Sequence, residues 1–240
     1  MKSNKEIAVI MAAGLGSRML PLTETLAKPL IPVFATPMIE TLISALLKRE
    51  VEKLYIVTGY KSEQFDYLSA KYSNITLVKN EEYNTKNNIS SLNLVCDYLG
   101  AANCFICEAD LLVNDETIFF FDFQQSCYFG KFVSGYSSDW VFEMEAERIT
   151  KITKGGTDLF NMTGVSYWLK EDAKQIAQAV RAASLVADND QRFWDEIVNL
   201  LLDKIDLTIY PVTAKQLVEI DTVAELQEVR RTLAAADYIA

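Results

Sequence analysis

The segment from Ala12 to Lys28 holds the first group of side chains whose types and spacing could do chemistry. It begins with a loop that directly follows an apolar run and reads Ala12-Ala13-Gly14-Leu15-Gly16-Ser17-Arg18. Two glycines let the backbone pass close to a ligand, and successive backbone N–H groups in such a loop can bind an anion. The guanidinium of Arg18 matches phosphate oxygens in a bidentate way, and Lys28 adds a second cation from a proline-stiffened segment. This group indicates a site for a phosphate-bearing ligand.

Two better-known glycine patterns do not fit this loop. A Rossmann dinucleotide fingerprint needs a third glycine, and Met19 stands at that position. A Walker A loop needs Gly-Lys followed by Ser or Thr, which this segment lacks. A dinucleotide-binding oxidoreductase is therefore disfavoured. On the glycines alone, a tight turn between a strand and a helix is an equally good interpretation.

The second group of candidate side chains is acidic. It is Glu108-Ala109-Asp110, which stands at the end of an apolar run. In open α/β sheets, ligands bind outside the carboxyl ends of the strands, so a carboxylate at this point is well placed. Mg²⁺ takes one or two protein carboxylates together with phosphate oxygens and water. The position of this pair therefore favours a role beside a bound phosphate.

The composition excludes several classes of enzyme. The 240 residues include no histidine, and the formal net charge is −10. There is thus no Ser-His-Asp or Cys-His pair, no His-ligated zinc or iron and no imidazole general base. The acidic balance argues against nucleic acid or an anionic membrane surface as the main partner. Catalysis must use carboxylates, lysine, arginine, hydroxyls, thiols or a bound metal.

The cysteines indicate the compartment rather than the chemistry. Of the four, Cys104 and Cys107 form a C-x-x-C. On a strand this spacing sends the two side chains to opposite faces, so we expect buried structural thiols and no metal or redox pair. The N-terminal apolar stretch is too short for a secretion signal, and no window reaches the ~18 apolar residues of a membrane span. We therefore expect a protein of the reducing cytoplasm, without membrane insertion.

Apolar periodicity divides the chain into an alternating first half and a strand-rich second half. In the first half we expect strands at 7–12, 54–58, 75–78 and 104–107, and helices at 37–49, 62–72 and 89–98. In the second half we expect strands at 126–134, 139–145, 148–153, 162–169, 207–212 and 216–220, and helices at 171–186, 191–203 and 222–236. This order predicts a Rossmann-like α/β fold with a mixed, mostly parallel sheet flanked by helices and a smaller β-rich part.

The string G-x-G-S-R-M-x-P-x-T-x(4)-K-P-L over residues 14–30 resembles the signature of nucleotidyltransferases that activate sugar phosphates and related phosphate monoesters. The resemblance implies one domain over 1–240, with a nucleotide-binding half over about 1–125 and an acceptor-binding half over about 126–240. It implies that Arg18 and Lys28 are catalytic and neutralise the phosphates of a nucleoside triphosphate. The loop residues that it places on the nucleotide are Ala12, Ala13, Gly14, Gly16 and Ser17. Family members usually have proline before the lysine, and Ala27 in its place reduces the constraint on the loop.

A second stretch, Asn80 to Leu92, is similar to the Asn-x-x-Tyr…Asn-Asn-x-x-Ser-Leu segment of bacterial CTP:phosphocholine cytidylyltransferases. An amide both donates and accepts hydrogen bonds, so an Asn-Asn pair suits the edge of a pyrimidine. The residues that the resemblance places near the cytosine are Gly59, Tyr60, Asn87, Asn88 and Ser91. Helix capping is the alternative for the two asparagines.

The same resemblance implies an Mg²⁺ cofactor. Asp110 matches the family aspartate that binds the metal at a strand end, and Asp221 in Glu219-Ile220-Asp221-Thr222 matches the second family carboxylate. Asp195 is the reserve candidate for the second ligand. As the alternative, Asp221 caps the last helix and binds no metal.

The three tryptophans suggest the acceptor, because aromatic faces hold quaternary ammonium groups. Each lies in a segment that resembles one in the phosphocholine enzymes. The predicted acceptor-binding residues are Trp140, Tyr167, Trp168, Trp194 and Asp195, with Glu143 as an alternative source of negative charge. The competing interpretation is that these aromatic residues belong to the core.

Together, these resemblances imply an enzyme that transfers CMP from CTP to phosphocholine and yields CDP-choline and pyrophosphate with Mg²⁺. The phosphate nucleophile is already charged at pH 7, so no general base is required. A sugar-1-phosphate nucleotidyltransferase and a cytidylyltransferase for another amino-alcohol phosphate are alternatives. A non-catalytic nucleotide-sensing domain is an alternative of a different class. The sequence does not decide whether CTP is preferred to UTP, nor the oligomeric state or the pathway.

Overall fold

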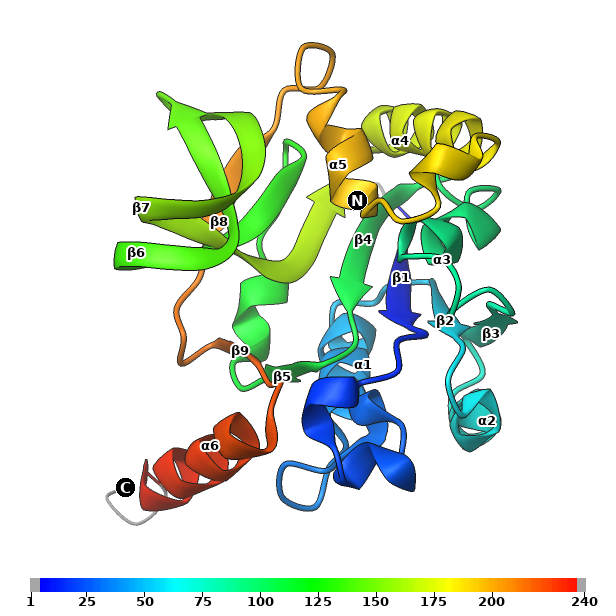
Figure 1. Ribbon diagram of the computed structural model, residues 1–240, viewed down its shortest axis with the longest axis vertical. Helices are drawn as coiled ribbons and strands as arrows, with labels where there is room; N and C mark the ends of the chain where they lie inside the picture. The colour runs from blue at the N-terminus through cyan, green and yellow to red at the C-terminus, as the bar shows by residue number, and fades with distance from the viewer. Residues whose placement is uncertain (1–4, 237–240) are drawn as a thin grey trace.

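The computed structural model describes residues 5–236, and at its centre is a seven-stranded sheet (Figure 1). The strand order is β3-β2-β1-β4-β7-β6-β8. The strands are β1 (Glu6–Ala12), β2 (Lys53–Thr58), β3 (Ile75–Lys79), β4 (Asn103–Glu108), β6 (Cys127–Glu145), β7 (Arg148–Trp168) and β8 (Thr208–Pro211). β7 runs antiparallel to both its neighbours, and the other pairs are parallel. The predicted mixed, mostly parallel α/β sheet is confirmed.

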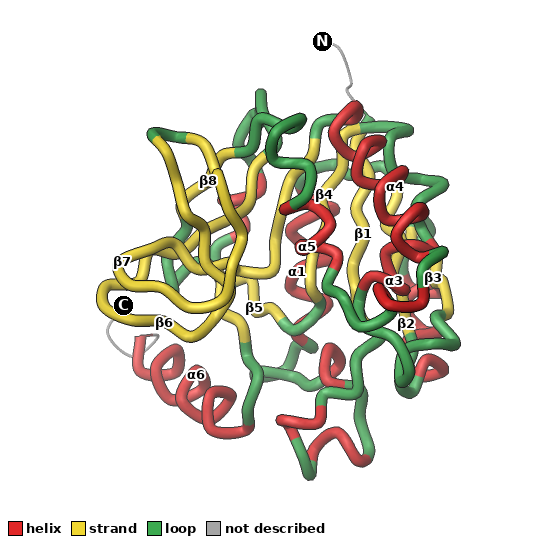
Figure 2. The backbone as a smooth tube through the Cα atoms, turned by 45° about the horizontal axis from the view of Figure 1, so that its top comes forward, coloured by secondary structure: helices red, strands yellow, loops and turns green. Residues whose placement is uncertain are grey.

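Helices cover both faces of the sheet, as Figure 2 shows. On one face lie α1 (Met38–Lys48) and α2 (Asp66–Lys71), and on the other lie α3 (Ile89–Leu94), α4 (Lys170–Ser184) and α5 (Trp194–Asn199). β1 illustrates why the pattern is apolar throughout, because Ala8 and Ile10 face α1 while Ile7 and Val9 face the other layer. Cys104 and Cys107 divide between the two faces in the same way, and all four cysteines are free and buried. Their predicted burial is confirmed.

A two-stranded sheet, which the apolar pattern predicts only in part, lies beside the main one. It pairs β5 (Leu111–Val113), which was not predicted, with β9 (Leu217–Glu219), and α6 (Val223–Ala236) follows β9. β5 starts three residues after β4 ends, so this pairing carries the chain after β9 to the end of β4. The backbone N–H of Ile220 donates to the Asp110 carbonyl oxygen at 3.1 Å. Two carboxylates far apart in sequence, Asp110 and Asp221, are thereby brought together.

The strand-rich region differs from the prediction of four short strands over 126–169. β6 and β7 are two long, bent strands joined into one hairpin, with several irregularities in their register. Gly135 and Gly155 have φ of 82° and 76° and lie within the strands, at bulges, rather than at turns between strands. The helix predicted over 191–203 is shorter in the structure, where α5 begins at Trp194 and ends at Asn199.

The direction of β7 decides where its last residues lie. Because β7 is antiparallel to β4, Tyr167 pairs with Phe105 and Trp168 with Cys104, at the start of β4. Glu108 and Asp110 follow the opposite end of β4. Tyr167 and Trp168 are therefore near the edge of the sheet that faces away from the carboxyl ends of the parallel strands.

This edge of the sheet, away from the carboxyl ends of the parallel strands, is held by a largely buried ion pair between Arg49 and Glu6. The guanidinium of Arg49 binds both oxygens of Glu6 at 2.6 and 2.8 Å and also donates to the carbonyls of Phe119 and Phe121. Its charged group lies 5.2 to 5.8 Å from the ring centroids of Phe105, Phe123 and Tyr167. The pair therefore ties α1 to the start of β1 and to the chain after β5.

Among the described residues, no helix is long and apolar enough to cross a membrane.

We expect Arg49→Met to lower the free energy of unfolding by about 3 kcal/mol or more, because it leaves the carboxylate of Glu6 buried without its partner. Lys48→Met, which removes the neighbouring but exposed pair with Glu116, is the matched control and should cost less than about 1 kcal/mol. Urea denaturation followed by circular dichroism measures both. Equal losses for the two variants would show that the Arg49 pair adds no more than a surface pair.

Candidate active site

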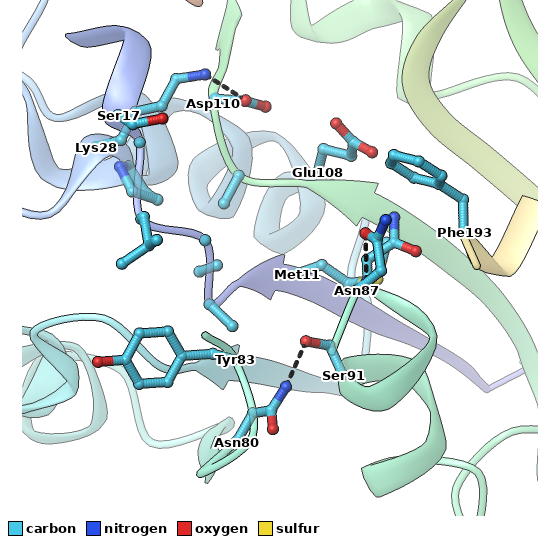
Figure 3. Close-up of a pocket in the computed structure, with 18 of the residues that line it drawn as sticks. Met11, Ser17, Lys28, Asn80, Tyr83, Asn87, Ser91, Glu108, Asp110 and Phe193 are labelled. Carbon is cyan, nitrogen blue, oxygen red and sulfur yellow. Dashed lines mark hydrogen bonds and ion pairs between the residues drawn. The ribbon is translucent and has the colours of Figure 1, made fainter. Parts of the chain in front are cut away.

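A cavity of about 340 Å³ opens at the carboxyl ends of β1 and β4 (Figure 3). The glycine loop forms one wall, and the start of α3 forms the other. Most of the predicted nucleotide and phosphate residues line it, namely Ala12, Ala13, Gly14, Gly16, Ser17, Arg18, Lys28, Asn87, Asn88, Ser91 and Asp110. The structure thus brings together residues that are up to 98 positions apart, from Ala12 to Asp110. Their individual roles stay predictions.

The shape of the glycine loop requires Gly16. Its φ is 63°, and a Cβ there would stand 2.7 Å from the Cβ of Lys28. Thr23 donates to the Gly16 carbonyl at 3.1 Å, and the hydroxyl of Tyr60 in turn donates to the Thr23 carbonyl at 2.8 Å. Only a residue without a side chain lets the loop fold back onto Lys28 in this way.

Ala27, where the family pattern usually has proline, does not leave the lysine loop free. Its backbone N–H donates to Oε1 of Gln64 at 2.8 Å, and Nε2 of Gln64 donates to the Thr25 carbonyl at 2.8 Å. Proline could not make the first of these bonds because it has no N–H. The side chain of Gln64, from the segment after β2, thus holds the lysine loop in place through two hydrogen bonds. The structure does not show the looser loop that was expected from Ala27.

Lys28 is the centre of the charged part of the site. Its ammonium donates to Oδ2 of Asp110 at 2.6 Å and to Oδ1 of Asp221 at 2.5 Å, and only 7% of the residue is exposed. Arg18 also reaches Oδ1 of Asp221, at 2.8 Å. Burial lowers the pKa of Lys28, but the charge of Asp110 and the hydrogen bonds to both aspartates outweigh it and raise that pKa above its ordinary value. The lysine is held as a cation.

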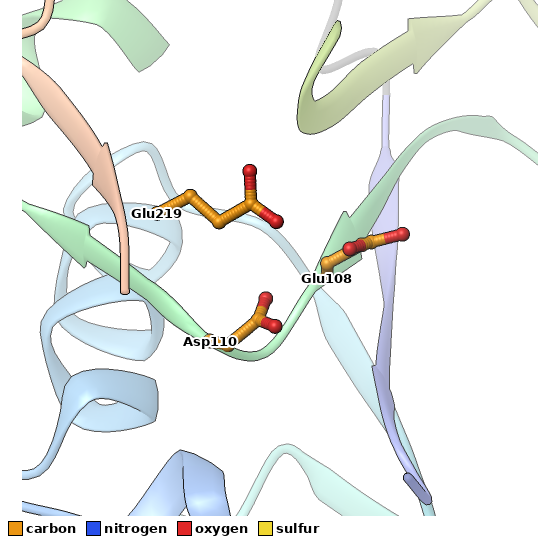
Figure 4. A group of neighbouring side chains, drawn as sticks. All are labelled: Glu108, Asp110 and Glu219. Carbon is orange, nitrogen blue, oxygen red and sulfur yellow. The ribbon is translucent and has the colours of Figure 1, made fainter. Parts of the chain in front are cut away.

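The carboxylates at this point fit a divalent cation. Glu108, Asp110 and Glu219 each place an oxygen within 4.8 Å of the others (Figure 4). Oδ1 of Asp110 is buried and has no hydrogen-bond partner among residues 5–236. Loss of hydration, and then the charge of Asp110, raises the pKa of both Glu108 and Glu219. Mg²⁺ prefers oxygen ligands, which these three carboxylates supply. Its charge would also offset the repulsion among them and give Oδ1 of Asp110 a partner.

Asp221 and Asp195 stand differently toward this cluster. Asp221 follows Glu219 by two residues, and its side chain shares the ammonium of Lys28 with Asp110. Within the described part of the chain, the three-carboxylate cluster contains neither Asp221 nor Asp195. Glu219, which precedes the predicted Asp221, is therefore an additional candidate ligand. The capping alternative for Asp221 does not describe its side chain, which binds Lys28 and Arg18.

The asparagine pair joins the two halves of the molecule. Oδ1 of Asn88 accepts from the backbone N–H of Trp194 at 2.9 Å, and Nδ2 of Asn87 donates to the Gln191 carbonyl at 3.1 Å. Asn88 thus caps the start of α5, which is remote in sequence, and its side chain forms no capping hydrogen bond with α3, the helix that it precedes. Asn80 is 2% exposed and donates to the hydroxyls of Ser90 and Ser91 at 3.0 Å each. These contacts orient the wall of the cavity.

Two predicted nucleotide residues lie outside the cavity lining, which contains neither Gly59 nor Tyr60 within the described chain. A Cβ on Gly59 would stand 2.6 Å from the Cβ of Tyr83 and 2.7 Å from the Ala13 carbonyl. Gly59 therefore lets Tyr83, which does line the cavity, come close to the loop. Tyr60 supports the loop through Thr23. Both act behind the surface that a ligand would touch.

A second cavity of about 300 Å³ adjoins the first and shares Arg18, Glu108 and Phe193 with it. Its remaining lining is Ser138, Asp139, Trp140, Lys154, Met162, Gly164, Asp195, Glu219 and Asp221. Of the predicted acceptor residues, Trp140 and Asp195 therefore border it. The cavity mixes carboxylates with two cations and two aromatic rings, so it suits a small ligand that carries both signs of charge.

The other three predicted acceptor residues do not line this cavity as the described chain forms it, so they do not assemble the predicted aromatic box there. Tyr167 is 1% exposed and donates to Glu6 at 2.8 Å, on the far edge of the sheet. Trp168 is fully buried and donates to Ser166 at 2.8 Å. The ring of Trp194 is 3% exposed and packs between Tyr128 and Trp168. The core interpretation holds for these three, because the antiparallel register of β7 and the start of α5 turn them inward.

Asp195 is a buried carboxylate at the floor of the second cavity. It is 3% exposed, and its Oδ1 accepts from the hydroxyl of Tyr128 at 2.7 Å. Burial raises its pKa to about 7, although the hydrogen bond from Tyr128 works in the opposite direction. Such a group is ready to accept a hydrogen bond from, or pair with, a cation that reaches it.

Several lining residues were not predicted. Tyr83 and Lys86 lie within the Asn80–Leu92 segment, and Glu108 lies two residues before the predicted Asp110, so proximity in the sequence was an available signal. Phe193 directly precedes the predicted Trp194, and Glu219 precedes the predicted Asp221 by two residues, so the same signal was available for both. Lys154 carries no such signal, because it reaches the cavity through the hairpin register that pairs it with Trp140.

A mostly parallel α/β sheet with an anion-binding loop after its first strand is the architecture of a nucleotide-binding protein. Comparison with known families makes this specific, since residues 7–129 match the family described as nucleotidyl transferase. The chain belongs to the nucleotidyl transferase family, and the resemblance of residues 14–30 to that signature is confirmed.

Relatives match over nearly the whole chain. A 2-aminoethylphosphonate cytidylyltransferase of Lancefieldella rimae is 48% identical over 93% of this chain and 92% of its own length. A choline-phosphate cytidylyltransferase of Streptococcus pneumoniae is 31% identical over 94% of this chain and 97% of its own. The solved structure of the CTP:phosphocholine cytidylyltransferase from Streptococcus pneumoniae has a TM-score of 0.88 and 29% identity, and the match covers 95% of this chain and 99% of that one.

The raised pKa of Asp195 has a consequence for stability. Because the folded state favours the protonated carboxyl, the free energy of unfolding falls as pH rises from about 4, the ordinary value, to about 7. Asp195→Asn keeps the shape and removes the charge, so at pH 8 we expect it to be about 2 kcal/mol or more stabler than the wild type. The difference should shrink toward pH 4.

Urea denaturation at pH 4, 6 and 8 measures this, with the exposed Asp203→Asn as control. A difference between Asp195→Asn and the wild type that is constant with pH would contradict the assignment of a raised pKa to Asp195.

Proposed function

We propose that this protein is a cytidylyltransferase that transfers CMP from CTP to a small acceptor carrying a phosphonate or phosphate and a primary ammonium, with 2-aminoethylphosphonate as the first candidate. The observation that carries the proposal is the lining of the second cavity, which includes both the cation Arg18 and the buried carboxylate Asp195. The relative that is 48% identical over 93% of the chain supports the choice of acceptor.

In the reaction, an oxygen of the acceptor attacks the α-phosphorus of CTP. A new P–O bond forms, the bond to the β-phosphate oxygen breaks, and pyrophosphate leaves with the electron pair. The acceptor oxygen is already ionised near neutral pH, so no side chain has to remove a proton. What the chain must supply is alignment of two anions and stabilisation of the growing charge.

The residues for this task come from both cavities. Arg18 borders each cavity and bonds to Asp221 at 2.8 Å, so its guanidinium is positioned to contact both the triphosphate and the acceptor anion. Lys28 lies beside the glycine loop, whose backbone N–H groups would bind phosphate oxygens. Mg²⁺ held by Asp110 with Glu108, Glu219 or Asp221 would supply further positive charge to the triphosphate.

The cationic end of the acceptor would lie toward the carboxylates. Asp139, Asp195 and Glu219 line the second cavity, and a primary ammonium donates three hydrogen bonds, which carboxylates accept. A trimethylammonium group has no hydrogen to donate and depends on aromatic faces. The small number of aromatic residues in this lining therefore favours the primary ammonium.

Phosphocholine is the second candidate acceptor. Its support is Trp140, which was predicted for this role and borders the cavity with Phe193, together with the Streptococcus pneumoniae relative at 31% identity. Sugar 1-phosphates fit less well, because the cavity offers charged groups where a sugar would need neutral hydroxyl partners.

A pyrophosphate-release assay with Mg²⁺ tests the proposal directly. CTP, UTP, dTTP and ATP are paired with 2-aminoethylphosphonate, phosphoethanolamine, phosphocholine and glucose 1-phosphate. We expect CTP with 2-aminoethylphosphonate to give a kcat/KM at least about tenfold above CTP with phosphocholine, a difference of about 1.4 kcal/mol in transition-state binding. Faster release with glucose 1-phosphate would overturn the proposal, and faster release with phosphocholine would favour the second candidate.

We expect Lys28→Met to lower kcat by about 100-fold or more, because it removes a charged donor that stabilises the transition state. Lys79→Met, whose ammonium pairs with the exposed Glu81, is the matched control and should retain activity. Circular dichroism verifies that both variants fold. Wild-type release of pyrophosphate by a folded Lys28→Met variant would remove Lys28 from the mechanism.

A further inference from the structure

We propose that Lys154 is a specificity-determining residue that keeps quaternary ammonium groups out of the acceptor cavity by occupying its aromatic corner with the protein's own cation. The inference rests on the proposed function, since it concerns the acceptor of that same reaction. It concerns a residue that neither the glycine loop nor the carboxylate cluster involves.

The corner consists of Trp140 and Phe193. Their ring centroids are 5.5 Å apart, and the ring planes meet at 69°, so the two faces form an open angle. Both rings line the second cavity, and they are the aromatic residues in its lining as the described chain forms it. Any trimethylammonium group bound in this cavity would therefore have to use this corner.

The corner is already filled. The ammonium of Lys154 lies 5.0 Å from the ring centroid of Trp140 and 5.0 Å from that of Phe193. Lys154 is the cross-strand partner of Trp140 in the β6–β7 hairpin, so the sheet register delivers the lysine to the tryptophan. Within residues 5–236, the two rings are the interaction partners of this ammonium, since it forms no ion pair there.

The occupied corner has two consequences for a ligand. A cation that approached the rings would meet a like charge and would have to displace Lys154 from both faces. An anion would be attracted to the same place, and Arg18 in the same lining adds to that attraction. A primary ammonium avoids the conflict because Asp195 and Glu219 offer it carboxylates elsewhere in the cavity. Lys154 thus discriminates by the position of charge and not by the size of the cavity.

Removal of the lysine charge tests this. In Lys154→Met the stem keeps its length and apolar contacts, and the corner is left for another cation. We expect the ratio of kcat/KM for phosphocholine to that for 2-aminoethylphosphonate to rise about tenfold or more. Lys154→Arg, which keeps a cation able to stack on both rings, should retain the wild-type ratio.

A second measurement does not depend on turnover. Tetramethylammonium carries only the quaternary charge, and its binding can be followed by tryptophan fluorescence and by calorimetry. Lys154→Met should bind it about tenfold more tightly than the wild type, and adding Trp140→Leu to that variant should abolish the gain. Lys151→Met is the matched control, because Lys151 lies on the same strand and pairs with the exposed Glu143 at 2.7 Å.

The two measurements separate the possible failures. If Lys154→Met and the wild type bind tetramethylammonium equally, the proposed role of Lys154 is overturned, whatever the enzyme's acceptor. If the wild type releases no pyrophosphate with CTP and any aminoalkyl phosphonate or phosphate, the proposed function fails, and the tetramethylammonium titration still decides the role of Lys154. A gain that also appears in Lys151→Met would show a general charge effect and overturn the inference.

Discussion

The contact on which the site depends is the pair of bonds from the Lys28 ammonium to Asp110 and Asp221, at 2.6 and 2.5 Å. A buried ammonium without partners would cost several kcal/mol, and so would two buried carboxylates. Their combination is tolerable only where three separate segments meet, namely the lysine loop, the end of β4 and the chain after β9. The first cavity is thus built around a cation that the fold already has to neutralise.

That meeting point depends on contacts that are distant in sequence. β5 and β9 pair over only three residues each, yet this short pairing brings Asp221 to Asp110 and Glu219 to the acidic cluster. The bonds from Asn87 and Asn88 to the segment around Gln191 and Trp194 act similarly on the other side. Each connection links the first half of the chain to the second, so the geometry of one cavity constrains the other.

Local patterns were enough to predict the four parallel strands of the first half (β1 to β4), the fold class and the glycine loop that lines the first cavity. These features depend on neighbours in the chain, such as the apolar run before Gly14 and the spacing from Arg18 to Lys28. The misplacement of Tyr167 and Trp168 has the opposite cause. Both residues were correctly expected on a strand, but the antiparallel pairing of that strand with β4 places them at the edge of the sheet away from the cavities, and no local pattern contains that direction. Lys154 was missed for the same reason, because only the hairpin register sets it opposite Trp140.

The net charge of −10 acquires a meaning once the cavities are known. An acidic protein that binds a polyanion must gather its cations where the anion lies, and Arg18, Lys28 and Lys86 all line the first cavity. The second cavity adds carboxylates to a lining that also holds Arg18 and Lys154, so groups of both signs face the same small space. For the zwitterionic acceptor proposed above, such a lining would favour binding in which each end of the ligand meets the opposite charge. Orientation by charge would then supply the alignment that a reaction without a general base requires.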